Sequence, residues 1–196
     1  MATQSERREA TIAALDRAAR QLFETRGFAD TTVDDIAAKA GVAKGAFYHH
    51  YGSKEAVFTK VLEAVQSTVA REVAAAASRS ADPVERLRVG LRIYVEACER
   101  PSVRRILLID GPTVLGWIRW REIDDQFFGE MTRRTVAAAL GSRATATHVQ
   151  AVASLIAGAF AEAAMVGAAQ SKLKSRDLTA AMDLLLKGLE SPSPRA

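Results

Sequence analysis

The sequence predicts an all-α fold with about nine helices, because apolar residues recur at helical spacing in nearly every segment. No segment alternates between apolar and polar residues for long enough to predict a strand. Alanine, the strongest helix former, occupies 38 of the 196 positions. The shares of apolar residues (48%) and charged residues (26%) are typical of a globular protein and exclude a disordered or fibrous chain.

The N-terminal third predicts four helices. The first carries an apolar stripe and ends at Gly27, which can adopt the left-handed conformation. Thr31 or Thr32 can cap a short helix over 33–40 that ends at Gly41. A second short helix covers about 43–48, and Ser53 caps a long helix after it.

The remaining two thirds predict further helices separated by clear stop signals. Asp82, Pro83 and Glu85 form a strong helix start, with a cap, a proline in the first turn and a glutamate reaching back. Pro101 and Pro112 interrupt the chain. Apolar stripes predict two more helices over 149–167 and 178–189, and the tail at 191–196 is predicted to be disordered.

The charge and the N-terminus bear on partners and compartment. The net charge of +4 permits a polyanionic partner without requiring one. The single Cys98 cannot close an intramolecular disulfide, and the first ten residues lack the apolar run of a signal peptide. The stretch 151–169 is mainly Ala and Gly and contains Glu162, which predicts close helix packing and not a membrane span. We therefore expect a cytoplasmic protein with no membrane partner.

Residues 31–51 have the spacing of a helix-turn-helix. Ala37 allows two short helices to cross closely, Gly41 makes the turn, and Phe47 fixes the second helix on the first. The second helix would then enter a DNA major groove. A pair of helices that only pack together could show the same residues, so this pattern alone leaves that alternative open.

The segment from Ala18 to Glu63 closely resembles the N-terminal domain of TetR-family transcriptional repressors. The resemblance is carried by Arg26-Gly27-Phe28, Thr31-Thr32-Val33, Ile36-Ala37, Ala40-Gly41-Val42, Gly45, Phe47-Tyr48, Tyr51 and Ser53-Lys54-Glu55. It implies a DNA-binding domain over 8–68, with its helix-turn-helix at about 31–50. It also implies a C-terminal helical domain over 69–190 for effector binding and dimerisation.

Seven residues are expected to contact DNA: Thr31, Thr32, Lys44, Gly45, Tyr48, His49 and Lys54. Gly45 permits close approach, and Lys44 can reach a guanine or a phosphate. By the resemblance, Tyr48 and Lys54 contact phosphates, and a threonine hydroxyl adds a backbone contact. Adjacent histidines on a helix diverge by about 100°, and no third ligand lies nearby in the sequence. We therefore expect neither a metal nor a cofactor.

An interval without alanine, between Ala97 and Ala137, holds both tryptophans and several other bulky residues. The resemblance implies that this region encloses an effector pocket, and an apolar or aromatic small molecule is the favoured ligand. Asp110, Arg119, Arg121 and Glu122 could supply polar anchors, although aromatic residues that only form the core would give the same pattern. The expected effector contacts are Tyr94, Cys98, Asp110, Trp117, Trp120, Phe127, Phe128 and Met131.

The last two predicted helices are the candidates for dimerisation, since they combine small residues with a leucine stripe. A role in the core of one chain would produce the same stripes, so that alternative stays open. The expected interface residues are Ile156, Phe160, Ala164, Met182, Leu185, Leu186 and Leu189.

These observations predict a ligand-responsive repressor that binds a palindromic operator as a dimer and is released by a small effector. A TetR-like activator and a helical protein-interaction module without DNA binding are the alternatives. The sequence contains no phosphate-binding loop, dinucleotide fingerprint, nucleophile elbow or zinc-protease motif, so no enzyme is expected.

Overall fold

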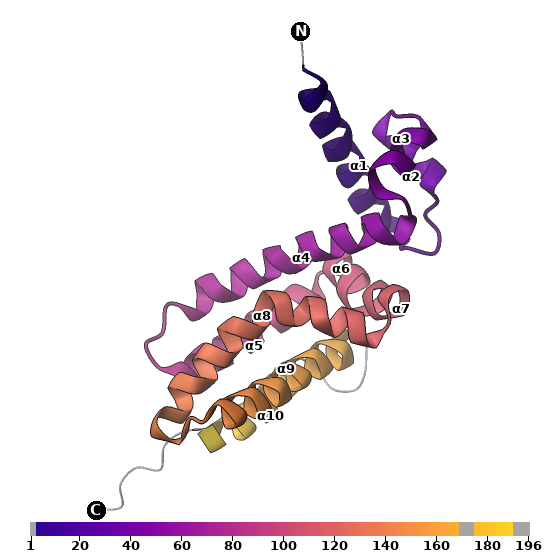
Figure 1. Cartoon of the computed structure of the whole chain (residues 1–196). Helices are drawn as coiled ribbons and strands as arrows, with labels where there is room; N and C mark the ends of the chain where they lie inside the picture. The colour runs from indigo at the N-terminus through magenta and orange to yellow at the C-terminus, as the bar shows by residue number, and fades with distance from the viewer. Residues whose placement is uncertain (1–2, 169–174, 190–196) are drawn as a thin grey trace, which may run out of the picture. The chain divides into compact units, whose positions relative to one another are not determined.

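The computed structural model describes residues 3–168 and 175–189, and the regular structure in these ranges is helical throughout, without a strand (Figure 1). The expected all-α class is thus confirmed. The predicted disordered tail at 191–196 lies outside the described residues. The α-helices are α1 (Gln4–Arg26), α2 (Val33–Ala40), α3 (Lys44–Tyr51), α4 (Lys54–Ala77), α5 (Pro83–Glu99), α6 (Pro101–Arg104), α7 (Gly111–Leu115), α8 (Trp117–Leu140), α9 (Ala146–Ala168) and α10 (Ser175–Leu186).

The chain forms two compact units. Unit 1 comprises Met1–Val65 together with Pro101–Trp120, and unit 2 comprises Gln66–Arg100 together with Arg121–Ala196. The segment 101–120 therefore groups with the N-terminal helices, although the sequence pattern assigns it to the C-terminal domain. Helices α4 and α8 are each shared, because they continue without interruption through a boundary between the units.

Unit 1 is built on an apolar core beneath α1, α2 and α3. Phe23 and Phe58 are fully buried and meet edge to face, with ring centroids 5.3 Å apart. Thr32 caps α2 by accepting from the Asp35 amide, and the Asp35 carboxylate accepts from the Thr32 amide in return. At Gly41, φ is 69°, so glycine provides the left-handed turn that ends α2 before α3 begins.

A π-helical segment, η1 (Arg105–Asp110), joins α6 to α7 within unit 1. The Trp120 indole donates to the Leu107 carbonyl over 2.8 Å. Gly111 has no room for a side chain, because a Cβ there would lie 2.9 Å from both Leu62 and Trp120. The segment is thus packed closely against the unit 1 parts of α4 and α8.

Unit 2 has its own core, which α5, α9 and α10 form with α8; α5 packs on both α9 and α10. Its buried members are Val84, Leu87, Leu91, Val95, Val136, Ala153, Ile156, Ala163, Met182 and Leu186. Among the described residues, one helical stretch, Ala146–Gly167, is long and apolar enough to cross a bilayer by length and composition alone. That is weak evidence for a membrane span, since core helices of soluble proteins pass the same test.

Candidate nucleic-acid interface and regulatory cavity

Helix α3 presents four of the expected DNA contacts on one exposed face. Phe47 is fully buried and holds α3 in unit 1, whereas Lys44, Gly45, Tyr48 and His49 are exposed. Positions separated by four on a helix share a face. A Cβ on Gly45 would meet no other atom within 4 Å, so its surface is open to a partner.

The Lys44 ammonium is already paired in the structure. It lies 2.9 Å from a carboxylate oxygen of Asp34 on α2, and this hydrogen bond raises the pKa of Lys44. Both side chains are exposed. A DNA phosphate or guanine would therefore have to compete with Asp34 for this ammonium.

The turn between α1 and α2 is held from two directions. The Lys54 ammonium donates to the carbonyls of Phe28 (2.9 Å) and Thr31 (2.8 Å) and lies 4.0 Å from the centroid of the Phe28 ring. The Phe28 amide donates to the Asp110 carboxylate over 2.9 Å. Two of the three Lys54 protons are thus committed within unit 1, and the predicted phosphate contact of Lys54 stays a prediction.

One expected contact needs correction. Thr31 is fully buried and its hydroxyl donates to the Gly27 carbonyl over 2.7 Å, so that side chain is not available to DNA. Thr32 is exposed and remains a candidate. Asp110 lies in unit 1, where one carboxylate oxygen accepts from the Phe28 amide, and its expected effector contact stays a prediction.

Unit 2 contains a mainly apolar cavity of about 50 Å³ between α4, α5, α8 and α9. Of the expected effector contacts, Tyr94, Phe128 and Met131 line it. The Tyr94 and Phe128 rings meet edge to face at 5.4 Å. The other lining residues are Val73, Ala77, Arg86, Leu87, Gly90, Asp124, Thr132, Thr135, Ala157 and Phe160.

The remaining expected effector contacts lie elsewhere. Trp120 is buried in unit 1, and Trp117 is exposed there with its ring 5.1 Å from that of Trp120. Cys98 is buried without lining the cavity, and burial raises the pKa of its thiol to about 12. Phe127 faces a separate surface groove of unit 2. The expected effector contacts were chosen as bulky and aromatic residues, and these two properties do not distinguish residues that line a cavity from residues of the core.

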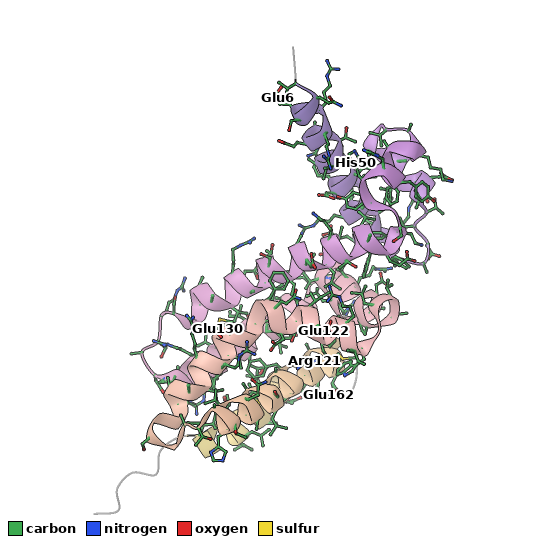
Figure 2. The ribbon with its side chains drawn as sticks, in the orientation of Figure 1. Glu6, His50, Arg121, Glu122, Glu130 and Glu162 are labelled. Atoms are coloured by element: carbon green, nitrogen blue, oxygen red, sulfur yellow. The ribbon has the colours of Figure 1, made fainter. Side chains whose placement is uncertain are left out.

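Asp124 is the acidic residue among the lining residues that sequence reasoning missed. It lies four residues before Phe128 and seven before Met131, so helical spacing alone would have placed it on the same face. Its carboxylate accepts from the Gln66 amide over 2.8 Å and from the Arg121 guanidinium over 3.2 Å. Figure 2 shows Arg121 on α8. Burial raises the pKa of Asp124 to about 6, against the opposing effects of Arg121 and Gln66.

Helices α9 and α10 lie side by side in unit 2 (Figure 1). They expose an apolar face. Leu155, Leu184 and Leu185 are each exposed by two thirds or more, and a groove of about 280 Å³ runs beside them. Leu184 and Leu155 were absent from the expected interface. We call these three leucines the exposed leucine face.

Most of the other expected interface residues belong to the core of the chain itself. Ile156, Ala164, Met182 and Leu186 are buried within unit 2. Phe160 and Leu189 are half-buried, and Phe160 also lines the cavity. Only Leu185 of the predicted set is fully exposed, because neighbouring leucines on one helix stripe point to different sides.

Metal binding has no support in the described ranges 3–168 and 175–189, which show no group of three or more His, Cys, Asp or Glu side chains that could hold an ion. The His49 and His50 rings lie 5.1 Å apart, but His49 is exposed and His50 half-buried. The His49 ring therefore faces solvent, whereas the His50 ring is partly enclosed by the protein.

Two short helices joined by a glycine turn, each with a buried side and the second with an exposed face, define a helix-turn-helix protein. The comparisons agree with this class. Residues 17–61 match the family described as bacterial regulatory proteins of the tetR family, and residues 84–189 match the tetracyclin repressor-like C-terminal domain. The chain therefore belongs to the TetR family of helix-turn-helix transcriptional regulators.

Individual relatives support the same assignment. A TetR-family transcriptional regulator from Pectobacterium atrosepticum is 32% identical, with a TM-score of 0.79, covering 99% of this chain and 100% of that one. The repressor DhaR of Mycobacterium sp. (strain GP1) is 41% identical over 80 residues, which is 40% of each chain. The regulator EthR of Mycolicibacterium smegmatis is 36% identical over 88 residues, 44% of this chain and 39% of EthR. The chain thus covers less than half of the length of these two curated relatives.

Lys54 generates a test of its structural role. Replacing Lys54 with Met removes an ammonium that donates to two carbonyls, and hydrogen bonds from charged groups contribute about 1.5–3 kcal/mol each. Because Lys54 is only half-buried, we expect the free energy of unfolding to fall by about 2 kcal/mol. Urea unfolding followed by circular dichroism measures this change.

Lys60→Met, an exposed site on the same helix, is the matched control and should leave stability unchanged. Unchanged stability in Lys54→Met would show that the ammonium is not needed for the turn.

Asp124 generates a pH test. Its pKa of about 6 in the folded protein exceeds the unfolded value of about 3.9, so the folded state binds the proton more tightly. The resulting stabilisation is fully present below about pH 4 and is lost as pH rises through 6. Relative to Asp124→Asn, the parent should therefore lose about 2 kcal/mol of stability between pH 4 and pH 7.

Chemical unfolding of both proteins at several pH values measures this difference. The groups near Asp124 that affect its titration are Arg121, Gln66 and Asp125. Asp125→Asn, at an exposed neighbour, is the control and should not remove the pH dependence. A difference between parent and Asp124→Asn that does not vary with pH would contradict the raised pKa.

Proposed function

We propose that this chain is a ligand-responsive repressor that binds a palindromic operator as a dimer and is released by a small apolar or aromatic molecule. The observation that carries the DNA-binding part is the exposed face of α3, with Lys44, Gly45, Tyr48 and His49 directed away from the buried Phe47. The proposed DNA-binding domain is 8–68, and the proposed effector-binding and dimerisation domain is 69–190. Repression is favoured because the related DhaR is named as a repressor. The cytoplasm is the proposed compartment, since that is where operator DNA lies.

The α3 face has the composition of a DNA reader that depends on approach and charge. It contains none of the Arg, Asn or Gln side chains that most often read bases with two hydrogen bonds. Lys44 and His49 supply the polar groups, and Gly45 allows the backbone to approach the groove. DNA shape is therefore proposed to contribute to specificity alongside direct contacts.

The unit 2 cavity is the proposed effector site. Ligand pockets usually enclose about 300–1,000 Å³, whereas this cavity encloses about 50 Å³. An effector must therefore widen it by displacing the lining helices. Val73 and Ala77 of the lining belong to α4, which is one uninterrupted helix from Lys54, directly after α3. Effector binding is thus proposed to favour a second arrangement of α4 that fits the operator less well.

The exposed leucine face is the proposed dimer interface. Burying a leucine side chain is worth about 1.5–3 kcal/mol, and three such side chains are exposed on α9 and α10. In a twofold interface, the copies of each leucine on both protomers become buried. One short recognition helix reads few base pairs, so a second protomer on a second half-site supplies the remaining specificity.

Lys44 tests the DNA-binding part of the proposal. Lys44→Ala removes a contact to a base or phosphate and should weaken binding to the operator, recovered by selecting bound genomic DNA, by about 1–3 kcal/mol. Asp34→Asn should strengthen binding, because it frees the ammonium and removes a negative charge. Fluorescence anisotropy at several salt concentrations measures both effects, and the affinity of the parent should fall steeply with salt.

Lys39→Ala is the matched control, since Lys39 is exposed on α2 and outside the α3 face. It should change operator affinity much less than Lys44→Ala. Parental affinity in Lys44→Ala would remove this residue from the interface, and failure to select any DNA would contradict the proposed function as a whole.

The interface has its own test. Leu185→Glu places a charge on the exposed leucine face and should raise the dimer dissociation constant at least about 100-fold, because each dimer contains two copies. Stability of the separate chain should change little, since Leu185 is 67% exposed. Analytical ultracentrifugation measures the assembly. Ile118→Glu, at an exposed site in unit 1, should leave it unchanged. Persistence of the dimer in Leu185→Glu would exclude this face.

A further inference from the structure

A buried acceptor without a donor lies next to the polar end of the unit 2 cavity, on Gln66, which contacts the lining residue Asp124 but is not itself part of the lining. Gln66 is 1% exposed, and its amide nitrogen donates to Asp124, which lines the cavity. The other atom of that amide, Oε1, finds no hydrogen-bond donor among residues 3–168 and 175–189. Above the pKa of Asp124, where its carboxylate only accepts, turning the amide over would place two acceptors against each other, so the bond to Asp124 fixes its orientation.

The groups around this acceptor are already committed as donors. The Gln66 nitrogen and the Arg121 guanidinium both donate to Asp124, one to each carboxylate oxygen. Tyr94 also lines this cavity. A buried acceptor left without a donor costs about 1–3 kcal/mol. This end of the cavity therefore favours a ligand that brings a donor.

Charge and shape restrict the ligand further. The Arg121 guanidinium offsets the Asp124 carboxylate, so a cationic ligand would meet no net negative charge. The Tyr94 and Phe128 rings form an aromatic wall beside Asp124. At the other end, Ala77, Arg86, Met131 and Thr135 also line a surface groove, and on α8 Met131 and Thr135 lie about 10 Å and about 16 Å from Asp124 at 1.5 Å per residue. A ligand entering from the groove would place its leading group at the polar end.

We propose that the effector is a neutral hydroxyl-bearing aromatic compound whose hydroxyl donates to Gln66 Oε1 at the polar end of the cavity. The inference rests on the proposed function, because it assigns a chemical class to the effector of the same cavity. The hydroxyl enters first, and the apolar remainder of the ligand lies along Phe128 and Met131 towards the groove.

Four probes on one skeleton test this assignment: 4-propylphenol, its methyl ether 4-propylanisole, 4-propylbenzylamine and 4-propylbenzoate. Isothermal titration calorimetry with the full chain should show the phenol binding at least 10-fold more tightly than the ether, which has no proton to donate. The amine and the benzoate should bind more weakly than the phenol. Equal affinities for phenol and ether would overturn the proposal, as would tighter binding of the amine or the benzoate.

Gln66→Met supplies the decisive variant, because methionine keeps the length of the side chain and has no amide oxygen. It should bring the affinities for phenol and ether within about threefold while the ether retains its parental affinity. Gln126→Leu, an amide removed from an exposed site on α8, is the control and should preserve the 10-fold preference. If Gln66→Met fails to fold, Gln66→Glu, an acceptor without the amide donor, replaces it and should keep the preference for the phenol. A preference for the phenol that persists in Gln66→Met would overturn the proposal.

A cavity-filling variant separates this inference from the proposed function. Ala157→Leu adds bulk to the cavity lining and should abolish binding of both phenol and ether. Loss of both with no phenol preference in the parent would leave the cavity as the effector site and refute only the ligand class. Binding of both probes unaffected by Ala157→Leu, or binding of none of the four to the parent, would refute the cavity itself as the effector site.

Discussion

The turn between α1 and α2 is the constraint on which unit 1 depends. Lys54 donates to two carbonyls of this turn, and Asp110 accepts from the Phe28 amide within it. The start of α4 and the end of η1 are thus both hydrogen-bonded to this one short loop, which leads into the helix-turn-helix. Because the turn leads directly to the Thr32 cap of α2, its position determines where α2 begins. The family motif around Lys54 therefore has a structural reason that is independent of DNA.

The cavity in unit 2 differs from the turn, because its polar groups are bonded less completely. Its enclosed volume is small, one of its walls contains a flexible methionine, and its polar end contains a carboxylate whose charged form is disfavoured by burial. These features leave polar groups that a ligand of the proposed kind could complete. The hydrogen bonds at the turn and the unpaired acceptor beside the cavity therefore agree with the proposed division into a DNA-binding and an effector-binding part.

The sequence predicted the helices well, including the two short helices of the helix-turn-helix, because these depend on local signals. Caps at Thr32 and Asp82 and the turn at Gly41 determine helix ends whatever packs around them. The residues that line the cavity were predicted poorly. Asp124 and Trp120 are one turn apart on α8, and only the packing along α8 decides that Asp124 lines the cavity whereas Trp120 is buried in unit 1. Leu185 and Leu186 show the same limit: one is exposed and the other buried, and composition cannot distinguish them. Burial of Thr31 likewise follows from a bond to Gly27 that no sequence signal reveals.

The two units are joined by three crossings of the chain. The chain passes between them at residues 65–66, 100–101 and 120–121. Two of these links, in α4 and α8, lie inside continuous helices, and the third follows α5 directly. All three helices line the cavity. The segment 101–120, which includes Asp110, is therefore continuous at one end with α8 and follows α5 at the other. Within unit 1, Lys54 at the start of α4 and Asp110 in this segment each end in hydrogen bonds to the α1–α2 turn, and these are the two chain segments through which the proposed effector response would act.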